Sequence, residues 1–136
     1  MNGSGPLRFE PVLGGLIVDF GGVLTEPGAE VLLAAAREHG LRTALLSNAD
    51  RLGDDDLAGL FDTVVLSGQV GFGKPDVRIY LLTAERLGLT PEECVFVDDM
   101  VSNVRGAVRA GMVGVHHRDV DTTLMELNAL FGTEFP

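Results

Sequence analysis

The feature that most constrains the fold is a regular alternation of short apolar runs with longer segments of helical periodicity. The runs are rich in β-branched and other apolar residues and nearly uninterrupted, which is typical of parallel strands covered on both faces. Five of them predict strands at residues 16–20, 43–47, 63–66, 94–97 and 113–115.

Four helices are predicted between and after these strands, at residues 29–39, 75–87, 102–110 and 122–131. Gly40, Gly88 and Gly111 follow three of them, where a left-handed residue commonly ends a helix, and Pro75 suits a first helical position. Strands that alternate with helices over short connections predict a doubly wound α/β domain. Its three layers are a five-stranded parallel sheet with helices on both faces.

The chain has 136 residues, 46% of them hydrophobic, which suffices for one domain with a real core and leaves little room for a second. We therefore expect a single domain over residues 1–136, with residues 1–10 as a flexible lead-in. The net charge of −10 argues against nucleic acid and anionic membranes as partners.

Other composition features point to a cytoplasmic protein. The only cysteine, Cys94, cannot form an internal disulfide, which fits a reducing compartment. No apolar run is long enough to span a membrane, and the N-terminus lacks the pattern of a secretory signal. The His116-His117 pair has no third ligand at a suitable spacing, so we expect it in a surface loop after the last strand.

Three carboxylates are expected at one edge of the sheet, beyond the carboxyl ends of the strands, where ligands bind in such folds. Asp19 falls near the end of the first predicted strand, and Asp98 and Asp99 follow the fourth. Each of these carboxylates could instead have a purely structural role, as the cap of a turn or of a helix. However, three neighbouring carboxylates repel one another unless a cation intervenes, and Mg²⁺ prefers oxygen ligands. The sequence therefore predicts a Mg²⁺ site.

Two further segments offer groups for binding an anion. Ser47 and Asn48 end the second predicted strand, where a hydroxyl and backbone N–H groups can receive a phosphate oxygen, although Ser-Asn is also an ordinary turn pair. Lys74 lies at a predicted helix start in the segment GQVGFGKP. Because the N-terminus of a helix favours anions, this ammonium is better explained by anion binding than by helix stabilisation.

Taken in order, four segments resemble the motifs of the haloacid dehalogenase (HAD) superfamily of hydrolases. They are LIVDFGGVL with Asp19, LLSNAD with Ser47, GKPD with Lys74, and FVDDMVSNVRGAVRAGM with Asp98, Asp99 and Asn103. The resemblance covers roughly residues 14–117, and four motifs in order are far more specific than one. It is closest to the haloacid dehalogenase/epoxide hydrolase-like branch and implies a Rossmann-like core.

This resemblance implies phosphoryl transfer through an aspartyl-phosphate. Asp19 would attack phosphorus, while Ser47 and Lys74 would hold the phosphate oxygens. The groups implied around Mg²⁺ are Asp19, the main-chain carbonyl of Gly21, Asp99 and, acting through water or on Lys74, Asp98.

One departure from the family pattern concerns proton transfer. Most phosphatases of the family carry a second Asp two residues after the nucleophile as general acid and base, and this chain has Gly21. Loss of a general acid typically costs about 10²–10⁴-fold in rate. A phosphatase with Gly21 would turn over slowly, would act on substrates with good leaving groups, or would take its general acid from elsewhere in the chain. Glu26 is one candidate for such an acid. The alternatives are a catalytically degenerate module that binds phosphate or a partner protein, and a haloacid dehalogenase-like hydrolase.

A second departure is size. Helical caps of the family are inserted after the first motif, yet the interval from Asp19 to Ser47 is filled by one loop, one helix and one strand. We therefore predict a core without a cap domain. Because an open site encloses a small molecule poorly, we expect either a large phosphorylated substrate, such as a phosphoprotein, or a lid from a second subunit of a homo-oligomer.

Overall fold

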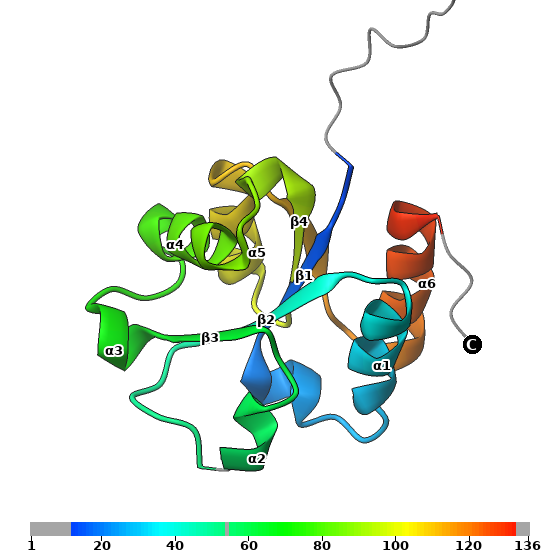
Figure 1. Ribbon diagram of the computed structural model, residues 1–136, viewed down its shortest axis with the longest axis horizontal. Coiled ribbons are helices and arrows are strands. Elements are labelled where there is room, and N and C mark those ends of the chain that lie inside the picture. Colours follow the sequence, from blue (N-terminus) through cyan, green and yellow to red (C-terminus); the bar gives the residue numbers. More distant parts are fainter. Residues whose placement is uncertain (1–11, 54, 133–136) are drawn as a thin grey trace, which may run out of the picture.

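The computed structural model describes residues 12–53 and 55–132. The predicted lead-in at residues 1–10 lies outside this part of the chain. The described residues form one parallel sheet with helices packed on both of its faces (Figure 1). The predicted doubly wound, three-layer architecture is therefore confirmed.

All five predicted strands are present and parallel: β1 (Gly15–Val18), β2 (Arg42–Ser47), β3 (Thr63–Leu66), β4 (Cys94–Asp98) and β5 (Val113–His116). Their order in the sheet is β3-β2-β1-β4-β5. The chain therefore builds outward from β1 to β3 and then crosses back to place β4 beside β1. Such a reversal of strand order opens a crevice at the carboxyl edge, which is where ligands bind in doubly wound folds.

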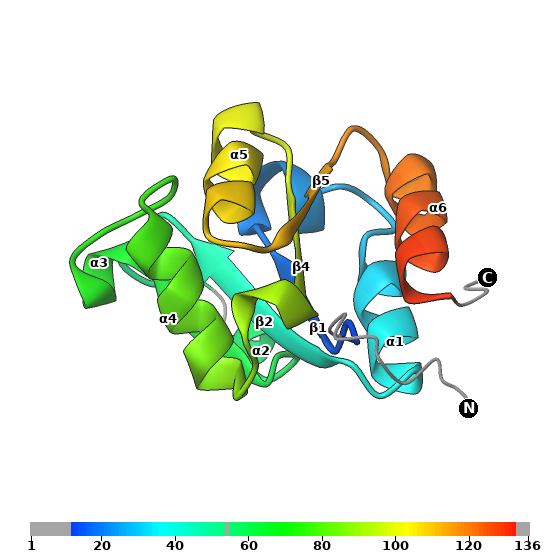
Figure 2. The same cartoon turned by 90° about the horizontal axis from the view of Figure 1, so that it is seen from above.

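The long helices form two layers. Helices α1 (Glu30–Glu38) and α6 (Val120–Phe131) cover one face of the sheet, and α4 (Val77–Leu87) and α5 (Val101–Arg109) cover the other (Figure 2). The shorter elements lie in the connections. They are the π-helical turn η2 (Phe20–Leu24), α2 (Asp55–Ala58), α3 (Ser67–Val70) and the 3₁₀ turn η3 (Pro91–Glu93).

The core consists of two apolar clusters separated by the sheet. Side chains alternate between the two faces of a strand, so Leu16 and Val18 pack with α1 and α6, whereas Ile17 packs with α4 and α5. All three are fully buried. Burial on both faces explains why the strands read as continuous apolar runs rather than as alternating ones.

Three predicted boundaries are wrong by two residues, one of them the start of the last helix, which lies at Val120 instead of residue 122. The first strand ends at Val18 instead of residue 20, because the chain turns sharply after Asp19 and leaves Phe20 37% exposed. Helix α4 begins at Val77 instead of Pro75, because the Asp76 carboxylate accepts a hydrogen bond from a backbone N–H group of the first turn and thereby takes the N-cap position.

Within the described residues, no inserted domain covers the carboxyl edge of the sheet, and the connections there are single turns or short helices. The prediction of a core without a cap is confirmed for this part of the chain. None of its helices combines the length and apolar character needed to cross a membrane.

Candidate active site

The three predicted carboxylates meet at the carboxyl edge of the sheet. The backbone N–H of Asp19 donates to Val97 O at 3.1 Å, which continues the pairing of β1 with β4 one residue beyond β1. Asp98 is the last residue of β4. One oxygen from each of Asp19, Asp98 and Asp99 can be chosen so that all three lie within 4.8 Å of one another. The parallel register is what brings together groups that are far apart in sequence.

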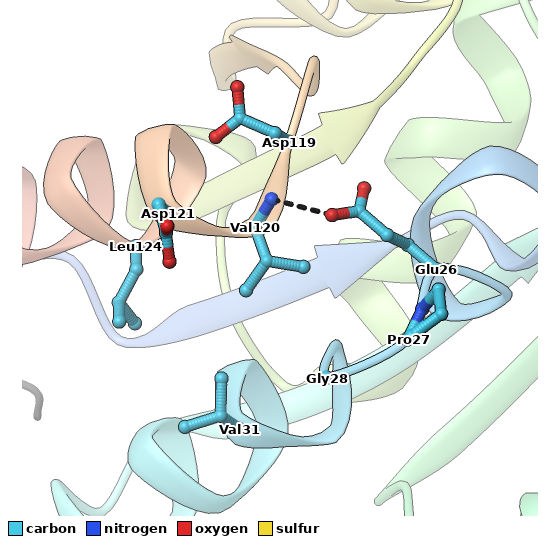
Figure 3. A pocket seen from close by; sticks show the side chains of 8 residues that line it. All are labelled: Glu26, Pro27, Gly28, Val31, Asp119, Val120, Asp121 and Leu124. Carbon is cyan, nitrogen blue, oxygen red and sulfur yellow. Dashed lines mark hydrogen bonds between the residues drawn. The ribbon is translucent and has the colours of Figure 1, made fainter.

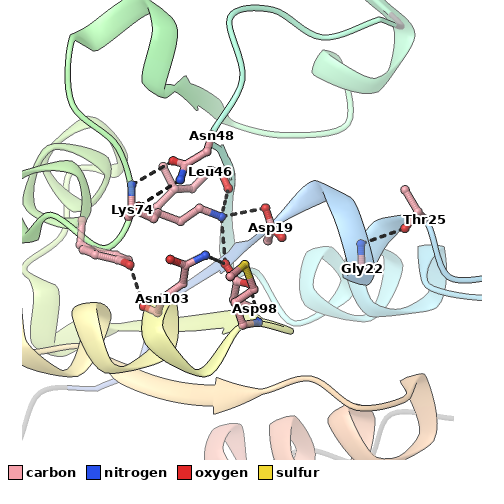
Figure 4. A network of polar contacts seen from close by, with 10 residues as sticks. Asp19, Gly22, Thr25, Leu46, Asn48, Lys74, Asp98 and Asn103 are labelled. Atoms are coloured by element: carbon pink, nitrogen blue, oxygen red, sulfur yellow. Dashed lines mark hydrogen bonds and ion pairs between the residues drawn. The ribbon is translucent and has the colours of Figure 1, made fainter.

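Lys74 lies between two of these carboxylates, those of Asp19 and Asp98 (Figure 4). Its Nζ is 2.7 Å from Asp19 Oδ1 and 2.9 Å from Asp98 Oδ2, and it also donates to Leu46 O at 3.0 Å. The Lys74 side chain is 1% exposed. The ammonium predicted to bind an anion thus binds two carboxylates and holds the Asp19 side chain in place.

Asn48 fixes the main chain at Lys74. Its Oδ1 accepts from Lys74 N at 2.9 Å, and its Nδ2 donates to Lys74 O at 3.0 Å. A Cβ on Gly73 would lie only 2.9 Å from Asn48 Oδ1, so the glycine lets this loop approach. Asn48 was predicted to bind phosphate. In the structure, its side-chain amide positions Lys74. A phosphate contact through the backbone N–H of Asn48 stays a prediction.

The buried Asp98 carboxylate accepts three hydrogen bonds. They come from Lys74 Nζ, from Met100 N at 2.9 Å and from Asn103 Nδ2 at 3.1 Å. The main-chain carbonyl of Asn103 in turn accepts a 2.6 Å hydrogen bond from the Tyr80 hydroxyl. Asp98 is therefore held rigidly from three directions, while Asp99 lies exposed beside it.

The crowding of acidic groups affects their proton affinities. Burial raises the pKa of Asp19, and the adjacent Lys74 ammonium offsets this only in part. Partial loss of hydration beside the other carboxylates raises the pKa of the exposed Asp99, with hydrogen bonding to Asp98 and the negative charge of that residue as further causes. Three carboxylates face one ammonium, which leaves a charge of −2 when all are ionised. A divalent cation would neutralise it.

The turn after Asp19 also fits a cation at this position. Gly22 has φ +81°, and a Cβ there would overlap the Asp99 carboxylate. Its N–H donates to Thr25 Oγ1 at 2.9 Å, which closes the turn (Figure 4). The glycine thus allows the main chain after Asp19 to lie against Asp99. Oxygen donors on both sides of a tight crevice match the preference of Mg²⁺ for oxygen ligands.

Gly21 differs from Gly22 in having room for a side chain. Its φ and ψ of −68° and 131° are allowed for any residue, and a Cβ there would meet no atom within 4 Å. The lack of an acid at this position is therefore a property of the sequence and is not required by the backbone.

The positions of Glu26 and His117 differ from those expected, which were a source of protons for Glu26 and a surface loop for His117. His117 is buried, with Nδ1 2.6 Å from Thr123 Oγ1 and Nε2 2.8 Å from Glu26 Oε1, so it does not lie in a surface loop. Glu26 Oε2 also accepts from Val120 N at 2.9 Å (Figure 3). The hydrogen bond with His117 lowers the pKa of Glu26. Glu26 is thus an acceptor that ties two loops together, and it does not replace the missing proton donor.

Ser47 ends β2, on the opposite side of β1 from β4 and Asp98, and it borders a pocket. Its residue surface is 8% exposed, and it lines a cavity of about 290 Å³ together with Phe20 and residues that follow β2. Nothing in the sequence predicted this cavity, because its lining comes from two connections that are separate in the chain. Its position next to Asp19 makes it part of the candidate site.

The sequence matches the haloacid dehalogenase-like hydrolase family over residues 9–111. It is 42% identical over 96 residues to the phosphoserine phosphatase of Thermus thermophilus, which covers 65% of this chain and 39% of that protein. It is 36% identical over 96 residues to the phosphorylated carbohydrates phosphatase of Thermotoga maritima, covering 66% of this chain and 44% of that one. The chain therefore spans less than half the length of either relative.

A solved structure of similar size also matches. An uncharacterized protein from Corynebacterium glutamicum is 40% identical, with a TM-score of 0.82, and the match covers 90% of this chain and 97% of the other. The two chains thus share a compact architecture over almost their whole lengths.

Proposed function

The chain belongs to the haloacid dehalogenase-like hydrolases, and we propose that it is a Mg²⁺-dependent phosphatase that forms an aspartyl-phosphate on Asp19. The observation that carries this proposal is the bridge from Lys74 Nζ to Asp19 and Asp98, with Asp99 alongside. A fixed carboxylate next to an ammonium and two further carboxylates suits phosphoryl transfer, in which positioning and charge neutralisation do most of the work.

The residues that would hold Mg²⁺ are Asp19, Asp99 and the main-chain carbonyl of Gly21, with Asp98 acting through water or on Lys74. When bound there, Mg²⁺ supplies positive charge that neutralises the charge developing on the phosphoryl oxygens.

The chain's own groups carry the two chemical steps. The Asp19 carboxylate forms a bond to phosphorus, while the ester P–O bond breaks and its electron pair goes to the leaving oxygen. That oxygen takes a proton from solvent, since Gly21 supplies none. Water then attacks phosphorus and loses a proton to solvent, which releases inorganic phosphate and regenerates the carboxylate. Ser47 and Lys74 hold the phosphoryl oxygens throughout.

Gly21 favours a second candidate function. A chain without the usual acid and base could bind phosphate or a partner protein without turnover, and the open space at Gly21 shows that no other side chain fills this position. This module would keep the Lys74 bridge and bind phosphate, but release no product.

The identity of the substrate is also a proposal. The relatives named above are phosphatases of phosphoserine and of phosphorylated carbohydrates. Because the carboxyl edge of the described chain is open, we propose either a large phosphorylated substrate or a lid from a second copy. Sedimentation during turnover tests both alternatives. A monomer that hydrolyses small sugar phosphates rapidly would contradict both.

The experiment is hydrolysis of p-nitrophenyl phosphate with Mg²⁺ and with EDTA. We expect activity that needs Mg²⁺, disappears in Asp19→Asn and persists in Asp121→Asn, a matched change at an exposed residue of α6. Phosphate binding without hydrolysis in the wild-type protein would favour the binding module. Equal hydrolysis by wild type and Asp19→Asn would contradict the covalent mechanism.

A further inference from the structure

We propose that the cavity beside Ser47 binds the organic part of the substrate and selects phosphate monoesters of compact, largely apolar alcohols that carry a carboxylate. This inference rests on the proposed phosphatase function and names its substrate class. The side chains that form this leaving-group pocket are Phe20, Ser47, Ala49, Arg51, Leu52 and Leu57.

The position of the leaving-group pocket follows from the strand order. Ser47 ends β2 on one side of β1, whereas Asp98 ends β4 on the other side. Phe20 directly follows Asp19 and lines the pocket. A phosphoryl group held by Asp19 and Ser47 therefore has the acidic cluster on one side and this pocket on the other. Because Ser47 would hold the phosphoryl group and Phe20 follows Asp19 directly, the rest of the ester can extend from the phosphoryl group into this pocket.

The lining favours an apolar group. Four of its six side chains are apolar, and the cavity of about 290 Å³ lies at the small end of the volumes usual for ligand sites. Phe20 exposes 37% of its surface, so a bound ring or branched alkyl group can cover it. A sugar would leave several hydroxyl groups without partners there, because Ser47 and Arg51 are the only polar side chains that the described part of the lining offers.

Arg51 gives the leaving-group pocket its charge preference. Among the described residues that line the pocket, it is the only one with a charged side chain, although the chain as a whole carries a net charge of −10. Among the side chains that the structure describes, none forms an ion pair with Arg51. The proposed function commits Lys74 to the phosphoryl group and to the Asp19 and Asp98 carboxylates, which leaves Arg51 for a second anionic group of the ligand. A guanidinium at the rim of an apolar pocket suits a carboxylate at the far end of a ligand.

The first test measures binding without chemistry, so that differences between leaving groups do not enter. The probes are methylphosphonate, phenylphosphonate and 4-carboxyphenylphosphonate, titrated calorimetrically into the Mg²⁺-loaded protein. We expect the phenyl group to tighten binding about tenfold or more by burial of apolar surface. The carboxylate adds about threefold, as expected for a solvent-exposed ion pair.

Two variants assign these gains to residues. Leu52→Gln should remove most of the gain from the phenyl group and leave methylphosphonate binding unchanged, and Arg51→Gln should remove only the gain from the carboxylate. The matched controls are Leu130→Gln and Arg86→Gln, at exposed positions on α6 and α4. Equal affinity for methyl- and phenylphosphonate, or a Leu52→Gln effect of the same size on both, overturns the assignment.

Turnover of phenyl phosphate separates this inference from the proposed function. Hydrolysis that depends on Asp19 but is unaffected by Leu52→Gln, together with unselective phosphonate binding, leaves the phosphatase intact and overturns the pocket. Selective phosphonate binding without hydrolysis supports the pocket as a ligand site and overturns the phosphatase. Absence of binding for all three phosphonates overturns the pocket.

Discussion

Replacing Lys74 by Met tests the electrostatic organisation of the site. Methionine keeps most of the apolar stem and removes the ammonium, whose Nζ contacts Asp19 Oδ1, Asp98 Oδ2 and Leu46 O at 2.7 to 3.0 Å. Lys74 is the only lysine in the chain, so no other lysine can take over these contacts. The Asp98 side chain has no solvent exposure, and that of Asp19 is 13% exposed.

The expected cost follows from this burial. Removing one partner of a buried ion pair costs about 3–5 kcal/mol, because the other charge stays buried without compensation. Small domains are stable by about 5–15 kcal/mol, so Lys74→Met should remain folded with a much reduced margin. Removing the ammonium also raises the pKa of Asp19 further, since the charge and hydrogen bond of Lys74 oppose the effect of burial.

The assay is urea unfolding at pH 7 in EDTA, followed by circular dichroism, for wild type, Lys74→Met and Lys74→Met/Asp98→Asn. The double variant should be more stable than Lys74→Met, because a neutral amide replaces the uncompensated carboxylate while keeping its shape. Arg86→Met, at an exposed position, should change stability by less than about 0.5 kcal/mol. A loss below about 1 kcal/mol in Lys74→Met, or a double variant less stable than the single one, would refute this reasoning.

Three further predictions concern the turn after Asp19 and a helix cap. Gly21→Asp, which the backbone accommodates, should raise the turnover of alkyl phosphates by about 10²-fold through general acid catalysis and that of p-nitrophenyl phosphate much less. An equal effect on both substrates, or the same gain in Gly21→Asn, would exclude this role. Gly22→Ala, measured by Mg²⁺ titration and urea unfolding, should weaken Mg²⁺ binding because its Cβ overlaps the Asp99 carboxylate. It should also destabilise the fold by about 1–2 kcal/mol, since φ is +81°. The hydrogen bonds from Arg78 hold the pKa of Asp76 at about 2, below its ordinary value. The stabilisation that Asp76→Ala removes should therefore be complete above about pH 4 and vanish as the pH falls toward 2, which urea midpoints at several pH values will check.

The sequence predicts most of the site because the sheet is parallel. Asp19, Ser47 and Asp98 each lie at or just after the carboxyl end of a strand, and parallel strands bring all such ends to one edge. The roles of these residues in binding metal and phosphate stay predictions, whereas their convergence is observed. The fold was predictable because the strands and the long helices are encoded by local periodicity.

Other contacts had no signal in the sequence. Asn48 reads as a turn residue, and only the packed loop shows that its amide holds the main chain of Lys74. Glu26 and His117 are 91 residues apart, and no sequence motif indicates that they contact each other. The leaving-group pocket likewise combines Phe20 with a segment that follows a different strand.

The sequence by itself thus determined the strands, the long helices, the parallel arrangement of the strands and the identity of the groups at the carboxyl edge, because these depend on periodicity and turn chemistry within short segments. Only the tertiary structure decided which acceptors take the Lys74 ammonium, 55 residues from Asp19, and that His117 is buried against Glu26. Such pairings depend on how the sheet, the helices and the connecting loops pack against one another. A buried polar group must find its partner wherever packing places one, at any distance along the chain.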